Sequence, residues 1–161
     1  PERYEDILEQ KLNEAAVRKI PMLVANPDKV RPDVERPPMP GKIGDTYEQA
    51  LGGGPEAEAL VKRIGKPFRD IYDIALRDAT TDLSRICMVG DALETDVTGG
   101  SSVGIKTVWV IADGIHGPDV RGEESLLHGA MLVLDNFNAM EGTYAKGLSL
   151  SPSFVLQHFR Y

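Results

Sequence analysis

Two aspartates that follow a short apolar run are the residues of this sequence best suited to chemistry. The run 86–89 predicts a buried strand, and Gly90 and Asp91 come directly after it. Open α/β sheets bind ligands at the carboxyl ends of their strands, so this strand would deliver Asp91 to such a position. Asp96 follows five residues later, near the start of the next expected helix. Such carboxylates suit Mg²⁺, which takes few protein carboxylates and completes its shell with water and phosphate oxygens.

A lysine upstream carries the complementary charge. Lys66 lies in a Gly-Lys-Pro sequence, and the segment 68–79 that follows has helical periodicity. Pro67 suits the first turn of a helix, where its missing N–H costs little. An ammonium group at that entrance can neutralise a phosphate or a carboxylate nucleophile. Read separately, the lysine could be merely solvated and the aspartates could be ordinary turn residues. Their combination favours a site.

The elements around these residues alternate between strand and helix. Residues 86–89 and 107–111 predict strands with a helix near 94–103 between them, which is the pattern of a parallel βαβ unit. The loop 113–117 leaves the second strand and carries His116. This histidine could contact substrate or a catalytic water, although a loop histidine is more often only solvated. Further expected elements are a helix over 118–129, a strand over 130–134, a short helix over 137–146 and an apolar segment over 154–159 on the sheet edge.

The amino-terminal part is organised in the same way. Apolar residues at helical spacing predict an amphipathic helix over 4–20, and the apolar run 22–25 predicts a strand. Prolines are dense between residues 30 and 41, which indicates an irregular loop or a hairpin tip. The remaining expected elements are a helix over 41–51, a loop or a helical turn over 55–59 and a strand over 60–64.

The composition excludes several classes of protein. The chain has 161 residues, 42% of them hydrophobic, with a net charge of −7, so it lacks the basic surface that nucleic-acid binding requires. No apolar run approaches the length of a membrane span, and no signal peptide is visible. The one cysteine, Cys87, lies in an expected strand, where a buried thiol is predicted. We therefore expect a cytoplasmic protein with a small-molecule substrate.

Taken together, the motifs resemble those of the haloacid dehalogenase-like phosphatases. The resemblance rests on Gly65-Lys66-Pro67 with residues 71–76, on the G-D-x-x-x-T-D sequence of residues 90–96, and on Gly-Ile-Lys-Thr at 104–107. The G-D-x-x-x-T-D form and Ala-Asn-Pro-Asp at 25–28 are similar to subclass IIA, whose members carry a large α/β cap. This likeness implies an α/β fold, with the carboxyl-terminal part of a Rossmann-like parallel sheet over 59–161 and part of an α/β cap over 1–58.

The resemblance also implies a reaction. Members of this family hydrolyse phosphate monoesters through an aspartyl-phosphate, with Mg²⁺ as cofactor. By this likeness Asp91 would be the metal ligand, Lys66 would hold the nucleophile and the phosphate, and Asp96 would orient the metal shell or Lys66. Candidate contacts to a small phosphorylated metabolite come from the cap segment, at Asn26, Asp28 and Arg31, and from His116.

One part of the family pattern is missing from this sequence. The nucleophile of the family lies in a D-x-D motif, and no aspartate of this chain is followed two residues later by another. Either the chain is the carboxyl-terminal portion of a longer phosphatase, partnered by an upstream segment carrying D-x-D-G, or it is a noncatalytic binding or scaffold protein that retains the metal and anion pocket. The half-cap and the absent initiator methionine favour the first alternative, which would leave a sheet edge exposed.

A dinucleotide-binding oxidoreductase is disfavoured, because the glycines do not have the G-x-G-x-x-G spacing. The substrate and any homo-oligomeric state stay open.

Overall fold

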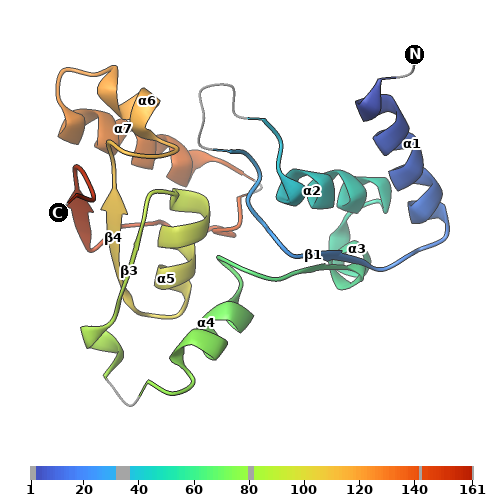
Figure 1. Cartoon of the computed structure of the whole chain (residues 1–161), viewed down its shortest axis with the longest axis horizontal. Coiled ribbons are helices and arrows are strands. Elements are labelled where there is room, and N and C mark those ends of the chain that lie inside the picture. Colours follow the sequence, from blue (N-terminus) through green and yellow to red (C-terminus); the bar gives the residue numbers. More distant parts are fainter. Residues whose placement is uncertain (1–2, 32–36, 80–81, 142, 161) are drawn as a thin grey trace. The chain divides into compact units, whose positions relative to one another are not determined.

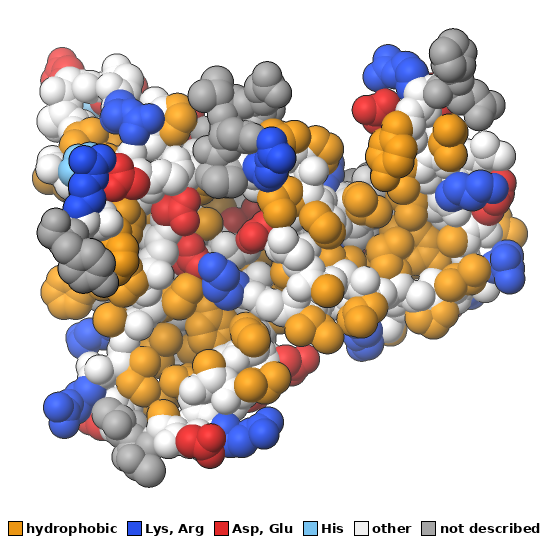
Figure 2. All heavy atoms as spheres, in the orientation of Figure 1, with side chains coloured by type: hydrophobic (Ala, Val, Ile, Leu, Met, Phe, Trp, Pro, Cys, Tyr) orange, Lys and Arg blue, Asp and Glu red, His pale blue; other side chains and the backbone are white. Residues whose placement is uncertain are grey.

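The chain folds into two compact units, seen in a computed structural model that describes residues 3–31, 37–79, 82–141 and 143–160 (Figure 1). The first unit holds the described residues up to Gly65, and the second begins at Lys66. Hydrophobic side chains reach the surface of both units (Figure 2).

The first unit packs helices against a two-stranded parallel sheet. Its elements are α1 (Tyr4–Val17), β1 (Met22–Val24), α2 (Pro40–Ala50), α3 (Gly54–Leu60) and β2 (Val61–Arg63). Its core consists of Leu12, Ala16, Val24, Tyr47 and Val61. The helices expected over 4–20 and 41–51 and the strand expected over 22–25 are confirmed, with shifted ends. The segment that the sequence left open between a loop and a helical turn forms α3.

The second unit contains a three-stranded parallel sheet with the strand order β3-β4-β5. Its elements are α4 (Arg69–Leu76), η1 (Leu83–Arg85), β3 (Cys87–Gly90), η2 (Leu93–Val97), α5 (Thr98–Ser102), β4 (Lys106–Val110), α6 (Gly117–Arg121), α7 (Leu126–Ala139) and β5 (Phe154–Leu156). The expected parallel pairing of the first two strands and the docking of the last apolar segment on the sheet edge are confirmed. The expected helix after β3 forms as a π-helical turn, η2, which continues into α5.

The two faces of this sheet differ in burial. One face carries Trp109, which is 1% exposed and belongs to a core cluster with Leu93 and Val97. The other face carries Cys87 and Val89 of β3, and both are exposed. The prediction of a buried thiol is therefore wrong. The reason is that β3 is an edge strand of the described sheet, with β4 as its neighbour on one side.

One further expectation is corrected. Residues 130–134 form no strand but lie inside α7, because Ser125 caps this helix by accepting a hydrogen bond from the His128 backbone N–H at 3.2 Å. A short apolar run cannot by itself distinguish a strand from a buried helix. In α4 the buried side chain is Tyr72, whereas Ile74 is 57% exposed. The helices in the described part of the chain are too short or too polar to cross a membrane.

Candidate active site

Asp91 lies where the sequence predicted, at the carboxyl end of β3. Its main-chain oxygen accepts a hydrogen bond from the indole N–H of Trp109 at 3.0 Å, which ties it to β4. Its carboxylate Oδ2 accepts the backbone N–H of Ile115 at 2.8 Å. Because β3 and β4 are parallel, the loops that leave them meet at the same edge of the sheet. Asp91 is therefore fixed by two contacts from the strand and the loop beside it.

Asp96 and Lys66 form an ion pair at the start of the same crossover. The Nζ atom of Lys66 lies 2.5 Å from Oδ1 of Asp96, and Oδ2 accepts the backbone N–H of Ala92 at 3.1 Å. The Asp96 side chain is 4% exposed, whereas the Lys66 side chain is 43% exposed. The carboxylate is thus buried under an ammonium group that still reaches solvent. The structure brings these two predicted residues together.

A cavity of about 400 Å³ opens at the carboxyl ends of β3 and β4. Its lining residues are Val89, Gly90, Asp91, Val110, Asp113, Gly114 and Phe159. The described residues contain no group of three or more His, Cys, Asp or Glu side chains placed to hold a metal ion. Mg²⁺ does not require such a group, since one or two carboxylates with water and phosphate oxygens suffice. Asp91 in the wall of this cavity fits that donor set.

His116 is held by the interior of the second unit. Its Nε2 atom accepts the backbone N–H of Leu93 at 3.3 Å, and its ring meets Trp109 edge-on at a centroid distance of 5.7 Å. It also precedes the first residue of α6. These contacts connect the loop after β4 to η2. A contact with substrate stays a prediction for this residue.

The three cap candidates lie in the loop that follows β1, in the first unit. Asn26 Oδ1 accepts the backbone N–H of Asp28 at 3.0 Å, the geometry of an Asx turn. Arg31 donates its backbone N–H to the carbonyl of Pro37 at 3.1 Å. Val30 and Pro38 also form an isolated antiparallel bridge, so the two sides of this segment lie next to each other, while residues 32–36 lie outside the described part of the chain. Substrate contacts by Asn26, Asp28 and Arg31 stay a prediction.

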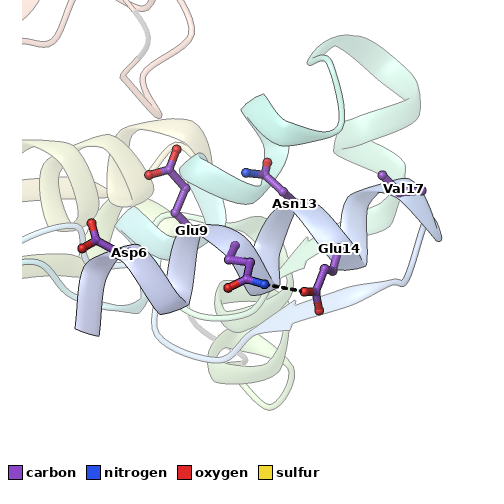
Figure 3. A pocket seen from close by; sticks show the side chains of 6 residues that line it. Asp6, Glu9, Asn13, Glu14 and Val17 are labelled. Atoms are coloured by element: carbon purple, nitrogen blue, oxygen red, sulfur yellow. Dashed lines mark hydrogen bonds between the residues drawn. The ribbon is translucent and has the colours of Figure 1, made fainter. Parts of the chain in front are cut away.

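A second hollow follows the outer surface of α1. It is lined by Asp6, Glu9, Gln10, Asn13, Glu14 and Val17. Figure 3 shows these side chains spreading from one helix, with a single hydrogen bond among them, from Gln10 to Glu14 at 3.0 Å. Side chains that diverge from one helix into solvent do not enclose a small molecule. This hollow is therefore no candidate for the active site.

Comparison with known proteins identifies the core segment. Residues 63–140 match a family model described as HAD-hydrolase-like. This segment, just under half of the chain, is similar to the haloacid dehalogenase-like hydrolases. Phosphoglycolate phosphatase 2 of Arabidopsis thaliana is 42% identical over 62 residues, which are 38% of this chain and 20% of that protein. The acid sugar phosphatase of Staphylococcus haemolyticus is 38% identical over 96 residues, which are 59% of this chain and 35% of that protein.

A solved structure shares the fold of nearly the whole chain. The p-nitrophenyl phosphatase from Archaeoglobus fulgidus superposes with a TM-score of 0.60 at 24% identity, covering 97% of this chain and 49% of that chain. The present chain therefore spans about half the length of that structure, and a smaller share of the two curated relatives. The expected α/β fold with parallel strands is confirmed by this match, which is consistent with part of a Rossmann-like core and part of a cap.

Tyr72 is a site neighbour that sequence reasoning missed. The side chain is 6% exposed, and its hydroxyl is buried with no hydrogen-bond partner among the described residues. A Cβ atom on Gly99, three residues beyond Asp96, would lie 2.1 Å from that hydroxyl oxygen. Burial, followed by the negative charge of Asp96, raises the pKa of Tyr72 to about 12. Tyr72 thus packs beside α5, the helix that continues the turn η2 carrying Asp96.

The carboxyl-terminal residues were also missed. Phe159 lines the cavity that contains Asp91, and His158 Nδ1 lies 2.9 Å from Oδ1 of Asp113. The two residues of this last pair are 45 positions apart. Local periodicity carries no signal for such a contact. The sequence had indicated only that this segment packs on the sheet.

Proposed function

We propose that this chain forms the lysine- and metal-binding part of a Mg²⁺-dependent phosphatase that hydrolyses a small phosphate monoester. The observation that carries the proposal is the arrangement of Lys66, Asp96 and Asp91 around the carboxyl end of β3, within the segment that matches the haloacid dehalogenase-like hydrolases. The relatives support the substrate class, because two of them are named phosphoglycolate phosphatase and acid sugar phosphatase.

The roles of the side chains follow from their surroundings. Asp91 would hold Mg²⁺ through the carboxylate that lines the cavity, and Ile115 would fix the orientation of this carboxylate. The metal would neutralise charge on the transferring phosphoryl group. Lys66 would place a second positive charge beside that group, and Asp96, buried and paired with Lys66, would keep its ammonium in position.

The nucleophile is proposed to lie on an upstream segment that carries D-x-D-G and is not part of this chain. An aspartate there would attack phosphorus, form an aspartyl-phosphate and expel the alcohol, and water would then release phosphate. The unpaired side of β3 in the described sheet and its exposed residues Cys87 and Val89 support a missing neighbour at this edge. This upstream segment is the proposed partner of the chain.

The alternative is a noncatalytic binding or scaffold protein that retains the metal and anion pocket. It is favoured by one observation, the absence of any D-x-D sequence from the 161 residues. The two hypotheses share the pocket and differ in the chemistry, so a turnover assay separates them.

The test compares this chain and the parent protein that includes the upstream segment, using p-nitrophenyl phosphate with Mg²⁺ or with EDTA. We expect Mg²⁺-dependent turnover from the parent and none from the chain alone. Asp91→Asn in the parent should lower kcat at least about a thousandfold, while the exposed control Asp135→Asn on α7 keeps it. Full activity of Asp91→Asn would remove Asp91 from the metal site, and a parent without turnover would favour the scaffold alternative.

A further inference from the structure

The last described residues of the chain reach the loop that holds the candidate metal ligand. We propose that His158, Phe159 and Arg160 act as a C-terminal clamp: they fix Asp113, and through the loop 113–115 they position the carboxylate of Asp91. The clamp deepens the proposed function, since it rests on Asp91 being the metal ligand. In it His158 and Asp113 are positioning residues, not catalytic ones.

Residues that follow β5 connect the sheet to Asp113. Beyond the paired strands β4 and β5, the backbone N–H of Ala112 donates to the carbonyl of Gln157 at 3.0 Å. The two segments that follow these strands therefore continue side by side. His158 Nδ1 then lies 2.9 Å from Oδ1 of Asp113, and a guanidinium nitrogen of Arg160 lies 3.6 Å from the same oxygen. The hydrogen bond from His158 lowers the pKa of Asp113 against a smaller opposing effect of burial, and the nearby His158 and Arg160 side chains and the Phe159 backbone N–H lower it further. Three consecutive residues therefore converge on one carboxylate.

The next two residues of the loop connect Asp113 to the carboxylate of Asp91. Ile115 donates its backbone N–H to Asp91 Oδ2 at 2.8 Å. Between them Gly114 has a φ of +112°, and a Cβ atom there would lie 2.0 Å from the same Oδ2 atom. Both the backbone conformation and the space require glycine at this position. A loop this short and this close to the carboxylate transmits a shift of Asp113 to Asp91.

The clamp also forms part of the candidate active site. Phe159 lines the cavity together with Asp91 and Asp113, although most of its side chain is exposed. The same three-residue segment therefore holds the loop and forms part of the cavity wall. A segment that served only to end the sheet would need neither the side-chain contacts to Asp113 nor Phe159 in the wall.

The experiment measures the Ile115 amide in the metal-free chain by nuclear magnetic resonance. His158→Ala and Asp113→Asn should speed hydrogen exchange at Ile115 about fivefold or more, the equivalent of one hydrogen bond of about 1 kcal/mol. The controls His128→Ala and Asp135→Asn change exposed residues of α7 and should leave that exchange unchanged. Unchanged exchange in both clamp variants overturns the proposal. If His158→Ala does not fold, Asp113→Asn, which keeps the side-chain shape, decides.

A second readout separates the clamp from the proposed function. Mn²⁺ added to the wild-type chain should broaden the amide signals of Gly114 and Ile115, and Asp91→Asn should abolish this effect. In His158→Ala the Mn²⁺ concentration that produces the same broadening should rise about tenfold, as it does when other groups that orient a metal ligand are removed. Absence of broadening in the wild type counts against the metal site, while the metal-free exchange at Ile115 still decides the clamp. Broadening with unchanged Mn²⁺ affinity in His158→Ala counts against the clamp.

Discussion

Gly90 lies directly against the carboxylate of Asp96. A Cβ atom at Gly90 would be 2.1 Å from Oδ2 of Asp96, and this oxygen also accepts the Ala92 backbone N–H. The backbone of Gly90 does not have a positive φ, so glycine is needed here for space alone. The end of β3 is therefore shaped around the buried carboxylate that pairs with Lys66.

Gly90→Ala tests this relationship. We expect the added methyl group to displace Asp96, to weaken its pairing with Lys66 and to lower the free energy of unfolding by about 1–3 kcal/mol. Urea denaturation measures the change. The control is Cys87→Ala on the same strand, which alters an exposed side chain and should cost no more than about 0.5 kcal/mol. Equal stability of the two variants would show that the site tolerates the methyl group.

The Lys66–Asp96 pair should show strong energetic coupling. Lys66→Met leaves a nearly buried carboxylate with the Ala92 N–H as its remaining partner, at a cost of about 1–3 kcal/mol. Asp96→Asn alone should cost less, because the half-exposed lysine can turn to water. The double variant should be destabilised by about 1–2 kcal/mol less than the sum of the two single destabilisations. The exposed pair Arg69–Asp73 on α4 is the matched control, with coupling below about 0.5 kcal/mol. Additive costs at Lys66 and Asp96 would contradict the pairing.

The sequence predicted where Asp91, Asp96 and Lys66 lie better than it predicted the contacts that hold them. Asp91, Asp96 and Lys66 follow from short apolar runs and from turn residues, whose effect on structure is local. The contact between His158 and Asp113 joins residues 45 positions apart, and it depends on the parallel pairing of β5 with β4. No local pattern contains that pairing.

The wrong predictions of a strand over 130–134 and of a buried Cys87 also have physical causes. The run at 130–134 is apolar and short enough for a strand, and its helical state is set by the Ser125 cap and by packing on α6. At Gly129 of α7 a Cβ atom would lie 2.3 Å from the carbonyl oxygen of Val120 on α6, so this glycine permits the close approach. Burial of Cys87 was expected from its strand and failed because that strand lies at an edge.

Tyr72 should make stability depend on pH in the alkaline range. Its pKa in the folded chain is raised to about 12, so the folded state keeps a proton that the unfolded state loses above pH 10. The resulting stabilisation is complete below pH 10 and is lost as the pH rises to 12, by about 2 kcal/mol. We expect Tyr72→Phe to be as stable as wild type at pH 7 or slightly more stable, because no described group bonds to the hydroxyl. The difference between the two unfolding free energies should change in favour of the variant between pH 10 and 12.

Other groups titrate in the same range, and a matched variant removes their effect. Tyr4→Phe is the matched variant, because it removes the hydroxyl of a tyrosine that is 71% exposed. A parallel pH dependence for the Tyr4 and Tyr72 variants would contradict the buried environment of the Tyr72 hydroxyl.

Cys87 reports on the edge of β3. In this chain the thiol is exposed on an edge strand, so a thiol reagent should modify it in the folded state within about fivefold of the rate in urea. If the proposed upstream segment pairs with β3, the same cysteine should become protected in the parent protein, because a neighbouring strand covers both the edge and the side chains beside it. Mass spectrometry after timed labelling measures both rates, and Cys87 is the one cysteine of the chain, so the site of modification is unambiguous for the chain alone. Slow labelling of the folded chain would contradict the exposed edge. Equal labelling of chain and parent would instead place the upstream segment elsewhere, and the D-x-D-G strand could then not be the neighbour of Asp91.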